Sequence, residues 1–317
     1  MAERGDIHAG AVMNELRQLG AESCIIDPAE FPTTMGIRFR ASSLDTYFKI
    51  TSAEGSLESA DISAIWWRKS RRSAVSDEIR HPVVRRFASE ESTCAILGAL
   101  LSLNVPVVNA PNMAQAASYK LLQLRVAREV GLQVPDTLVT DSVDELTKFK
   151  RETGDLIYKP FSGIGFGAFE TRPMLDEDLS AADNIKYAPP IVQKHVVGEF
   201  DIRATVIGRR VLSAKILYHE GNHPVDSRSD IVPTVAHDIP HDVASALVEI
   251  NKRLGIAYGA FDLRYSDSTG YTFFEVNPAG QYLWIEMNTG LPISRAIALE
   301  LLSHPEDIPS ALGVLKV

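Results

Sequence analysis

The sequence predicts an α/β fold in three parts, and three observations support this prediction. Helices and strands alternate through residues 1–111, an order that is typical of an α/β layer. After residue 112 the chain continues with a long helix, short strands and a glycine-rich loop. Beyond residue 190 long strands dominate, and we expect them to pair antiparallel. We therefore expect an N-terminal α/β domain (1–111), a small central α/β subdomain (112–190) and a C-terminal subdomain on an antiparallel sheet (191–317).

Composition and charge exclude several classes of protein. The chain has 317 residues, of which 45% are hydrophobic and 23% charged, as in ordinary globular proteins. Its net charge of −9 predicts no general attraction to nucleic acid or to an anionic membrane. We find no apolar run near the roughly 18 residues that span a bilayer, and the first ten residues are too polar for a secretory signal. Cys24 and Cys94 form no CxxC pair, so neither a disulfide framework nor a thiolate zinc site is indicated. We expect a cytoplasmic protein with no nucleic-acid or membrane partner.

The N-terminal part is predicted to begin with a helix. Val12, Leu16 and Leu19 lie on one helical face, and Gly20 is a typical helix stop. The expected elements that follow are a strand at 23–27, a strand at 64–67, a helix at 87–103 and a strand at 105–111. No strand precedes the first helix, which leaves two alternatives open: the domain lacks an element, or the sequence begins downstream of the natural start.

The remaining elements follow from apolar periodicity and from turn residues. Helices are predicted at 118–131, 143–153, 242–255 and 292–303, and strands at 134–140, 155–161, 190–208 and 210–218. Residues 258–277 predict a hairpin with its turn near Ser268–Gly270.

Polar side chains interrupt the second strand of this hairpin, in "FFEVN" (273–277). Glu275 and Asn277 are two apart and therefore share a face. Antiparallel pairing brings Asp262 close to both, and three converging oxygen ligands suit a hard cation such as Mg²⁺. On the residues alone an alternative stays open, in which Glu275 pairs with an Arg and Asn277 caps the turn at Pro278.

Two lysines favour a phosphate ligand. Lys159 lies in an apolar strand just before the loop "SGIGFGAF" (162–169), and Lys120 lies near the start of a helix. A glycine loop can present backbone N–H groups to a phosphate, with Ser162, Gly163 and Gly165 as the candidates. The alternative for each lysine is a surface side chain whose apolar stem packs on the protein.

Other nucleotide and hydrolase motifs are missing from the sequence. It contains no GxxxxGK[ST], HExxH or GxSxG string. The string "GIGFGA" (163–168) loosely matches a dinucleotide fingerprint, but that fingerprint must open a helix, and here Pro173 follows closely.

Residues 105–305 resemble the ATP-grasp ligases. The features that carry the resemblance are "SYKLLQL", "LIYKP", "IVQKHVVGEFDIR", "AFDLRY" and "FFEVNPAGQ". The longer string "EVNPAGQYLWIE" with "TGLPI", and "WWR" at 66–68, are similar to the maturases of microviridin-type ribosomal peptides, the graspetide synthetases. The resemblance implies the α+β ATP-grasp fold, with a pre-ATP-grasp domain at the N-terminus and the central subdomain as a lid.

The resemblance also implies a role for each matching residue. Lys120 and Lys159 contact ATP phosphates; Gln193, Lys194, His195 and Val196 line the adenine; Glu199 binds the ribose; Asp262, Glu275 and Asn277 hold Mg²⁺; and Arg203 stabilises the transferring phosphoryl group. Arg203 and Lys215 belong to strands expected to flank the phosphates. Arg228 matches the Arg of the family's Asp-Trp-Arg, although residues 226–228 here are Asp-Ser-Arg. This departure puts the grip on the substrate peptide in doubt more than the binding of ATP.

The implied reaction is an ATP-dependent ligation. The γ-phosphoryl group of ATP activates a side-chain carboxylate as an acyl phosphate, which a hydroxyl or amine then attacks to give an ester or an amide. The implied partner is a precursor peptide with a leader and an acidic core, and a homodimer is expected from the resemblance alone. Two alternatives remain: a different ATP-grasp ligase that joins an amino acid to a small acid or a peptide terminus, and a catalytically silent peptide-binding protein.

Two basic stretches are candidates for contact with an acidic peptide. Residues 203–228 contain Arg203, Lys215 and Arg228, and for this stretch we favour a function. Residues 68–86 are also rich in arginine, but a solvated face is the simpler interpretation there.

Overall fold

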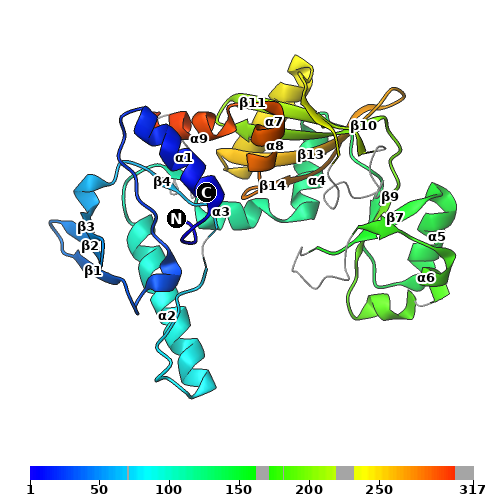
Figure 1. Cartoon of the computed structure of the whole chain (residues 1–317). Helices are drawn as coiled ribbons and strands as arrows, with labels where there is room; N and C mark the ends of the chain where they lie inside the picture. Colours follow the sequence, from blue (N-terminus) through cyan, green and yellow to red (C-terminus); the bar gives the residue numbers. More distant parts are fainter. Residues whose placement is uncertain (70, 162–170, 181, 219–231, 304–317) are drawn as a thin grey trace.

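The computed structural model describes residues 1–69, 71–161, 171–180, 182–218 and 232–303. The N-terminal part and a small unit around β7 and β9 lie on either side of the C-terminal sheet (Figure 1). Among the described residues, no helix is both long enough and apolar enough to cross a bilayer.

The N-terminal part combines helices with two small sheets. Helix α1 (Ile7–Gln18) begins at Asp6, whose carboxylate caps the helix by accepting from the Ala9 N–H. β1 (Gly36–Ala41), β2 (Thr46–Ser52) and β3 (Gly55–Glu58) form an antiparallel sheet, while β4 (Ile65–Trp66) and β5 (Val107–Val108) pair in parallel. α2 (Pro82–Leu101) packs Ile96 and Leu100 against this sheet region, and short 3₁₀ turns occupy Pro28–Glu30 and Ser59–Asp61.

Three predictions for this part need correction. Residues 23–27 form no strand, although the Ile26 carbonyl accepts from the Ala2 N–H. The sheet β1–β3 was not predicted, although Ile37-Arg38-Phe39-Arg40 alternates apolar and charged residues, and most of its first strand is exposed. α2 begins at Pro82 rather than at 87, because proline suits the first turn of a helix.

The central unit is a four-stranded sheet in the order β6-β9-β7-β8. Its strands are β6 (Thr137–Leu138), β7 (Leu156–Lys159), β8 (Arg172–Pro173) and β9 (Ile191–Lys194). α5 (Val143–Thr153), α6 (Asp176–Ser180) and a 3₁₀ turn at Ala182–Lys186 accompany this sheet. α5 forms where it was predicted, because Ser142 caps its start and Gly154 ends it at φ 89°.

The C-terminal sheet has five antiparallel strands in the order β12-β11-β10-β13-β14. They are β10 (Phe200–Ile207), β11 (Arg210–Ile216), β12 (Thr234–Ala236), β13 (Tyr258–Ser266) and β14 (Gly270–Asn277). α4 (Lys120–Glu129) and α7 (His241–Leu254) pack on one face of the sheet. The other face carries α8 (Leu283–Thr289), α9 (Ile293–Leu302) and α1. α3 (Pro111–Ala117) connects β5 to α4.

The predicted strand 190–208 is two strands in two different sheets. β9 ends at Lys194 and β10 begins at Phe200, and the chain crosses between the sheets in the residues between them. Gly198 allows the crossing, since a Cβ there would lie 2.3 Å from the Tyr265 carbonyl oxygen. β9 lies in the central sheet although it follows residue 190, and α4 packs on the C-terminal sheet although it precedes that residue. The domain boundaries at 112 and 191 remain predictions.

Candidate functional site

The hairpin β13–β14 brings together the acids that the sequence singled out. Asp262 lies directly opposite Glu275, and Ala260 lies opposite Asn277. The register shifts by one residue between Asp262 and Leu263, a bulge of the kind that often redirects side chains near functional sites. The two carboxylates therefore lie side by side near the end of the hairpin that leads into the turn at Pro278.

Each carboxylate is paired with a cation. Arg203 Nη1 lies 2.6 Å from Asp262 Oδ1, and Lys120 Nζ contacts Glu275 Oε2. Burial alone would lower the pKa of Arg203, but Asp262 raises it above its ordinary value, so the guanidinium keeps its charge. Glu275 is thus ion-paired, as the alternative to metal binding expected, with Lys120 as the described cation. Asn277 does cap the turn, since its Oδ1 accepts from the Ala279 N–H at 2.9 Å.

Buried donors hold the turn after β14 at its backbone carbonyls. Asn109 Nδ2 donates to the Pro278 carbonyl at 2.8 Å, and Arg203 Nη2 donates to the Gln281 carbonyl at 3.1 Å. The Tyr258 hydroxyl donates to the Gly280 carbonyl at 2.8 Å. Burial raises the pKa of Tyr258 to about 12, which keeps this hydroxyl protonated as a donor.

Gly280 is required by the close packing of this turn. A Cβ at this position would lie 2.5 Å from the Ala260 Cβ and 3.0 Å from Arg203 Nη2. Arg68 also reaches the turn, with Nη1 at 3.4 Å from the Gly280 carbonyl oxygen. The motif "NPAGQ" therefore forms a rigid turn beside the two carboxylates.

The candidate hinge lies between the two sheets. Gln193 is buried and donates from Nε2 to Thr137 Oγ1 at 2.9 Å, whereas Lys194 is exposed. The His195 N–H donates to the Asp155 carbonyl at 2.8 Å, and burial lowers the pKa of the His195 imidazole. Glu199 is exposed, and its Oε2 accepts from the Asp267 N–H at 2.9 Å.

A buried ion pair fixes this hinge to the C-terminal sheet. Arg264 donates to both carboxylate oxygens of Asp201, at 2.7 and 3.0 Å, and to the Val196 carbonyl at 2.9 Å. Its guanidinium also lies 4.1 Å from the Tyr218 ring centroid. Sequence reasoning missed Arg264, although "DLR" places it two residues after Asp262 and thus on the same face.

Lys215 lies on the other face of the sheet from Arg203. It pairs with Ile202 across β10–β11, whereas Arg203 pairs with Asp262 across β10–β13. Neighbouring residues on a strand project to opposite faces, so Lys215 and Arg203 lie on opposite faces of the sheet. The Lys215 ammonium lies 4.1 Å from the centroid of the Phe200 ring. Whether the strands that carry Lys215 and Arg203 flank the phosphates stays a prediction.

The remaining candidate residues are Lys159, those of the glycine loop and Arg228. Lys159 ends β7 and is 9% exposed, so a fully solvated surface position is wrong for it. Ser162, Gly163, Gly165 and Arg228 lie outside the described residues.

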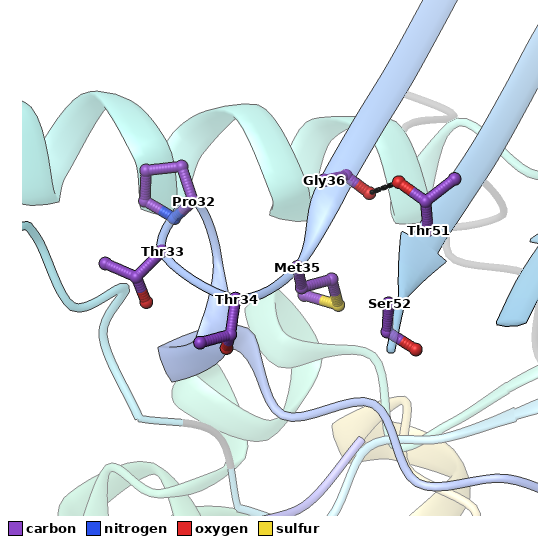
Figure 2. A pocket seen from close by; sticks show the side chains of 7 residues that line it. All are labelled: Pro32, Thr33, Thr34, Met35, Gly36, Thr51 and Ser52. Atoms are coloured by element: carbon purple, nitrogen blue, oxygen red, sulfur yellow. Dashed lines mark hydrogen bonds between the residues drawn. The ribbon is translucent and has the colours of Figure 1, made fainter. Parts of the chain in front are cut away.

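A hollow in the N-terminal part is lined by Pro32, Thr33, Thr34, Met35, Gly36, Thr51 and Ser52 (Figure 2). No titratable side chain lines this hollow, and we do not place the functional site there.

The donor set of the hairpin fits a magnesium ion. Asp262, Glu275 and Asn277 offer carboxylate and amide oxygens, the ligand type that Mg²⁺ prefers. Within the part of the chain that the structure describes, no group of three or more His, Cys, Asp or Glu side chains could hold a metal. Two carboxylates and one amide leave room for water and phosphate oxygens, which usually complete a magnesium shell.

Comparison with known proteins adds the fold family. Residues 6–115 match the family model described as the MvdD pre-ATP grasp domain. The whole chain is similar to the macrocyclase MdnC of Microcystis aeruginosa MRC, solved with its precursor peptide MdnA. The TM-score is 0.84 and the sequence identity is 25%. The match covers 95% of this chain and 97% of MdnC. The protein has the ATP-grasp fold.

Two other ATP-grasp ligases of known structure are similar over their whole length. The RiPP-associated ligase of Chryseobacterium gregarium, in complex with ADP and a leader and core peptide, has a TM-score of 0.89 and 22% identity, covering 97% of both chains. PsnB, complexed with a minimal precursor, Mg and ADP, has a TM-score of 0.78 and 25% identity, covering 95% of this chain and 94% of PsnB. No curated protein matches the chain by sequence.

Proposed function

We propose that this ATP-grasp protein is an ATP-dependent ligase that modifies a ribosomally made precursor peptide. It activates side-chain carboxylates of the peptide as acyl phosphates and closes macrocyclic esters or amides. The observation that carries the proposal is the pair Asp262 and Glu275, flanked by Arg203 and Lys120 in a chain with the fold of peptide macrocyclases.

The site residues have distinct roles in this proposal. Asp262, Glu275 and Asn277 would hold Mg²⁺, which supplies positive charge to the phosphate oxygens when it is bound. Lys120 contacts Glu275 from the start of α4, and Lys159 ends β7; their ammonium groups would bind phosphate oxygens. Arg203 is held in place by Asp262 and by the Gln281 carbonyl, so little reorganisation is needed to stabilise charge on a transferring group.

Nucleotide recognition is assigned to the hinge and the glycine loop. Backbone groups of Gln193–Val196 run along the adenine, and Glu199 is placed beside the ribose. Ser162, Gly163 and Gly165 belong to the proposed phosphate loop. Arg228 is proposed to hold the acceptor carboxylate bidentately.

The reaction needs no covalent enzyme intermediate. A carboxylate oxygen of the peptide attacks the γ-phosphorus, and ADP leaves. A hydroxyl or amine of the same peptide then attacks the carbonyl carbon, releasing phosphate and losing its proton. The enzyme contributes positioning and fixed charge, the two terms that dominate phosphoryl transfer.

The finer assignments belong to the same proposal. We propose a microviridin-like substrate with a leader and an acidic core, because an acidic core supplies the carboxylates that the reaction consumes. We also propose a cytoplasmic location and a homodimer; the acidic composition and the sparse cysteines support the location.

Replacing one carboxylate by its amide tests the function. In Glu275→Gln the side chain keeps its size but loses the charge that attracts both Mg²⁺ and Lys120. We expect ADP release to fall by roughly 100-fold or more, because a metal ligand is lost. The measurement is ADP release from purified protein with a candidate precursor peptide, together with loss of water from that peptide by mass spectrometry.

Glu249→Gln is the matched control, because this carboxylate pairs with Arg253 on the outer side of α7. ADP release should be unchanged in this control. Near-normal ADP release in Glu275→Gln would refute the metal site. ADP release by the wild-type protein with an amino acid added to an acceptor, and no loss of water from the peptide, would instead favour a different ATP-grasp ligase.

A further inference from the structure

β14 forms one edge of the C-terminal sheet. β14 is the last strand in the sheet order: one side pairs with β13, and on the other side the described chain has an isolated bridge from Gln133 to Thr272. Peptide groups on such an edge need other partners when they are buried. α4 lies along this side of β14.

One side chain of α4 replaces the missing strand at a single residue. Gln123 Oε1 accepts from the Val276 N–H at 3.1 Å, and Gln123 Nε2 donates to the Val276 carbonyl at 2.7 Å. The same Nε2 donates to the Ala117 carbonyl at 2.7 Å. The side chain therefore binds both the N–H and the carbonyl of one residue of the edge strand, as a clamp.

The clamped residue lies between two proposed metal ligands. Val276 separates Glu275 from Asn277, so fixing its N–H and carbonyl fixes the direction in which both neighbours project. Lys120 lies three residues before Gln123, on the same side of α4, and pairs with Glu275. α4 thus holds this stretch of β14 both by its backbone and by the Glu275 carboxylate.

Packing alone does not explain an amide at this position. Gln123 is 2% exposed and lies on a helix that contributes Leu124, Val126 and Ala127 to an apolar cluster. Burying an amide costs free energy unless its hydrogen bonds are made, whereas methionine would fill nearly the same volume without that cost. The three described bonds all go to main-chain atoms, so they fix a backbone path.

We propose that Gln123 is a positioning residue for the divalent-cation site, and this proposal rests on the proposed function. Its amide holds the N–H and the carbonyl of Val276 so that the Glu275 carboxylate and the Asn277 amide would converge on one cation beside Asp262. Gln123 itself does not touch the cation or the nucleotide. Its loss therefore weakens cation binding while leaving the rest of the nucleotide site in place.

The test compares Gln123→Met with Gln115→Met. The first removes the clamp at nearly constant volume, and the second makes the same change on exposed α3. The measurement is ADP binding by calorimetry at increasing Mn²⁺, with direct Mn²⁺ titration by electron paramagnetic resonance. We expect the Mn²⁺ concentration for half-maximal effect to rise about 10-fold in Gln123→Met, as for other groups that orient metal ligands.

Two further readouts separate positioning from general stability. ADP affinity without a divalent cation should stay within about twofold of the wild type in both variants, because the hinge contacts are untouched. Amide hydrogen exchange should accelerate in peptides covering 270–277 of Gln123→Met, but not in peptides covering β10. A Gln123→Met protein with wild-type Mn²⁺ dependence would overturn the proposal.

A second variant keeps the test decisive if Gln123→Met does not fold. Gln123→Leu removes the same three hydrogen bonds with an apolar side chain that suits a helix, so a similar rise in the Mn²⁺ requirement is expected. An unchanged requirement in a folded Gln123→Leu protein overturns the proposal. If wild-type ADP binding itself proves independent of divalent cations, the proposed function fails; if only the variants behave like wild type, the positioning role alone fails.

Discussion

At the residue scale, the site is a row of four charges. Across the sheet the order is Arg203, Asp262, Glu275 and Lys120, so two adjacent carboxylates are flanked by two cations. Adjacent carboxylates repel, and each one is stabilised here by its own cation. A divalent cation between the carboxylates would take over that stabilisation, which leaves Arg203 and Lys120 free to interact with phosphate oxygens.

A second group of charges lies where α1 meets this site. Arg68 Nε donates to both carboxylate oxygens of Asp6 at 3.0 Å, and the buried His8 ring packs edge-on against Tyr282 at 5.0 Å. Burial and the positive charge of Arg68 lower the pKa of His8 to about 4, although Asp6 opposes this shift. His8 is therefore neutral in the folded protein at pH values where an unfolded histidine already binds a proton.

This histidine predicts an acid-sensitive fold. Because the folded-state pKa of His8 lies below the unfolded value of about 6.5, the unfolded chain binds more protons between pH 6.5 and 4. The free energy of unfolding should fall as the pH falls through this window, with at most about 3 kcal/mol from His8. Urea unfolding of the wild type and of His8→Gln at pH 7.5, 6 and 5 measures the difference.

The control for this prediction is His241→Gln. His241 is exposed at the start of α7, and its replacement should leave the pH dependence of unfolding as in the wild type. Parallel stability curves for His8→Gln and the wild type would show that His8 does not titrate as the structure indicates.

At the element scale, the crossing from β9 to β10 is the key feature. Gln193 belongs to the central sheet and Asp201 to the C-terminal one, so the chain between them sets how the two sheets meet. Arg264 fastens this crossing through Asp201 and the Val196 carbonyl. It is 5% exposed, and Asp201 would be left without this partner if Arg264 were lost.

Removing Arg264 should therefore affect both stability and nucleotide affinity. We expect Arg264→Met to lower the free energy of unfolding by about 3 kcal/mol, because a largely buried carboxylate loses its guanidinium. ADP affinity should also fall, by roughly 10-fold or about 1.4 kcal/mol, because the Val196 carbonyl in the hinge loses its donor. Urea unfolding and calorimetry measure the two effects.

A double-mutant cycle with Asp201→Asn gives the control. The double variant has no uncompensated carboxylate. Its loss in the free energy of unfolding should therefore be smaller than the sum of the two single losses by about 1–3 kcal/mol. Simple additivity of the two losses would mean that the Asp201–Arg264 pair does not act as a unit.

At the scale of the whole molecule, the N-terminal part is built into the C-terminal sheet. Val12 and Leu16 of α1 and Val108 of β5 share an apolar cluster with Tyr258 and Ile297. Asn109, directly after β5, accepts from the Ala257 and Tyr258 N–H groups and donates to the Tyr258 and Pro278 carbonyls, all at 2.7–2.9 Å. The turn of the site is therefore braced from the N-terminal part of the chain.

Asn109→Leu tests whether the turn of the site depends on the N-terminal part. Four buried main-chain groups lose a partner, which we expect to lower the free energy of unfolding by about 3 kcal/mol or more. ADP affinity in the presence of Mg²⁺ should also weaken, because the Pro278 turn beside Asn277 loses its brace. Asn112→Leu, on an exposed position of α3, is the matched control and should change neither quantity. Equal effects of the two variants would argue against the brace.

The sequence alone determined the features that depend on near neighbours. α5 was predicted at its observed bounds, because its cap, its helix-forming residues and its terminating glycine all lie within one segment. The hairpin of 258–277 was predicted from two strand-like runs and a turn, and Gly270 takes the positive φ of 71° that such a turn needs. Spacing by two along a strand placed Glu275 and Asn277 together for the same reason.

Tertiary structure decided what depends on partners far away in the sequence. Lys120 meets Glu275 across 155 residues, and Asn109 meets Pro278 across 169, distances over which no local pattern carries information. Whether Lys215 shared a face with Arg203 depended on the register between strands, and a shift by one residue reverses the face. The break in 190–208 and the clamp by Gln123 likewise arise from the meeting of separate elements. Side-chain type and spacing thus determined which chemical groups the site contains, and only the packing of the sheets determined which of those groups face one another.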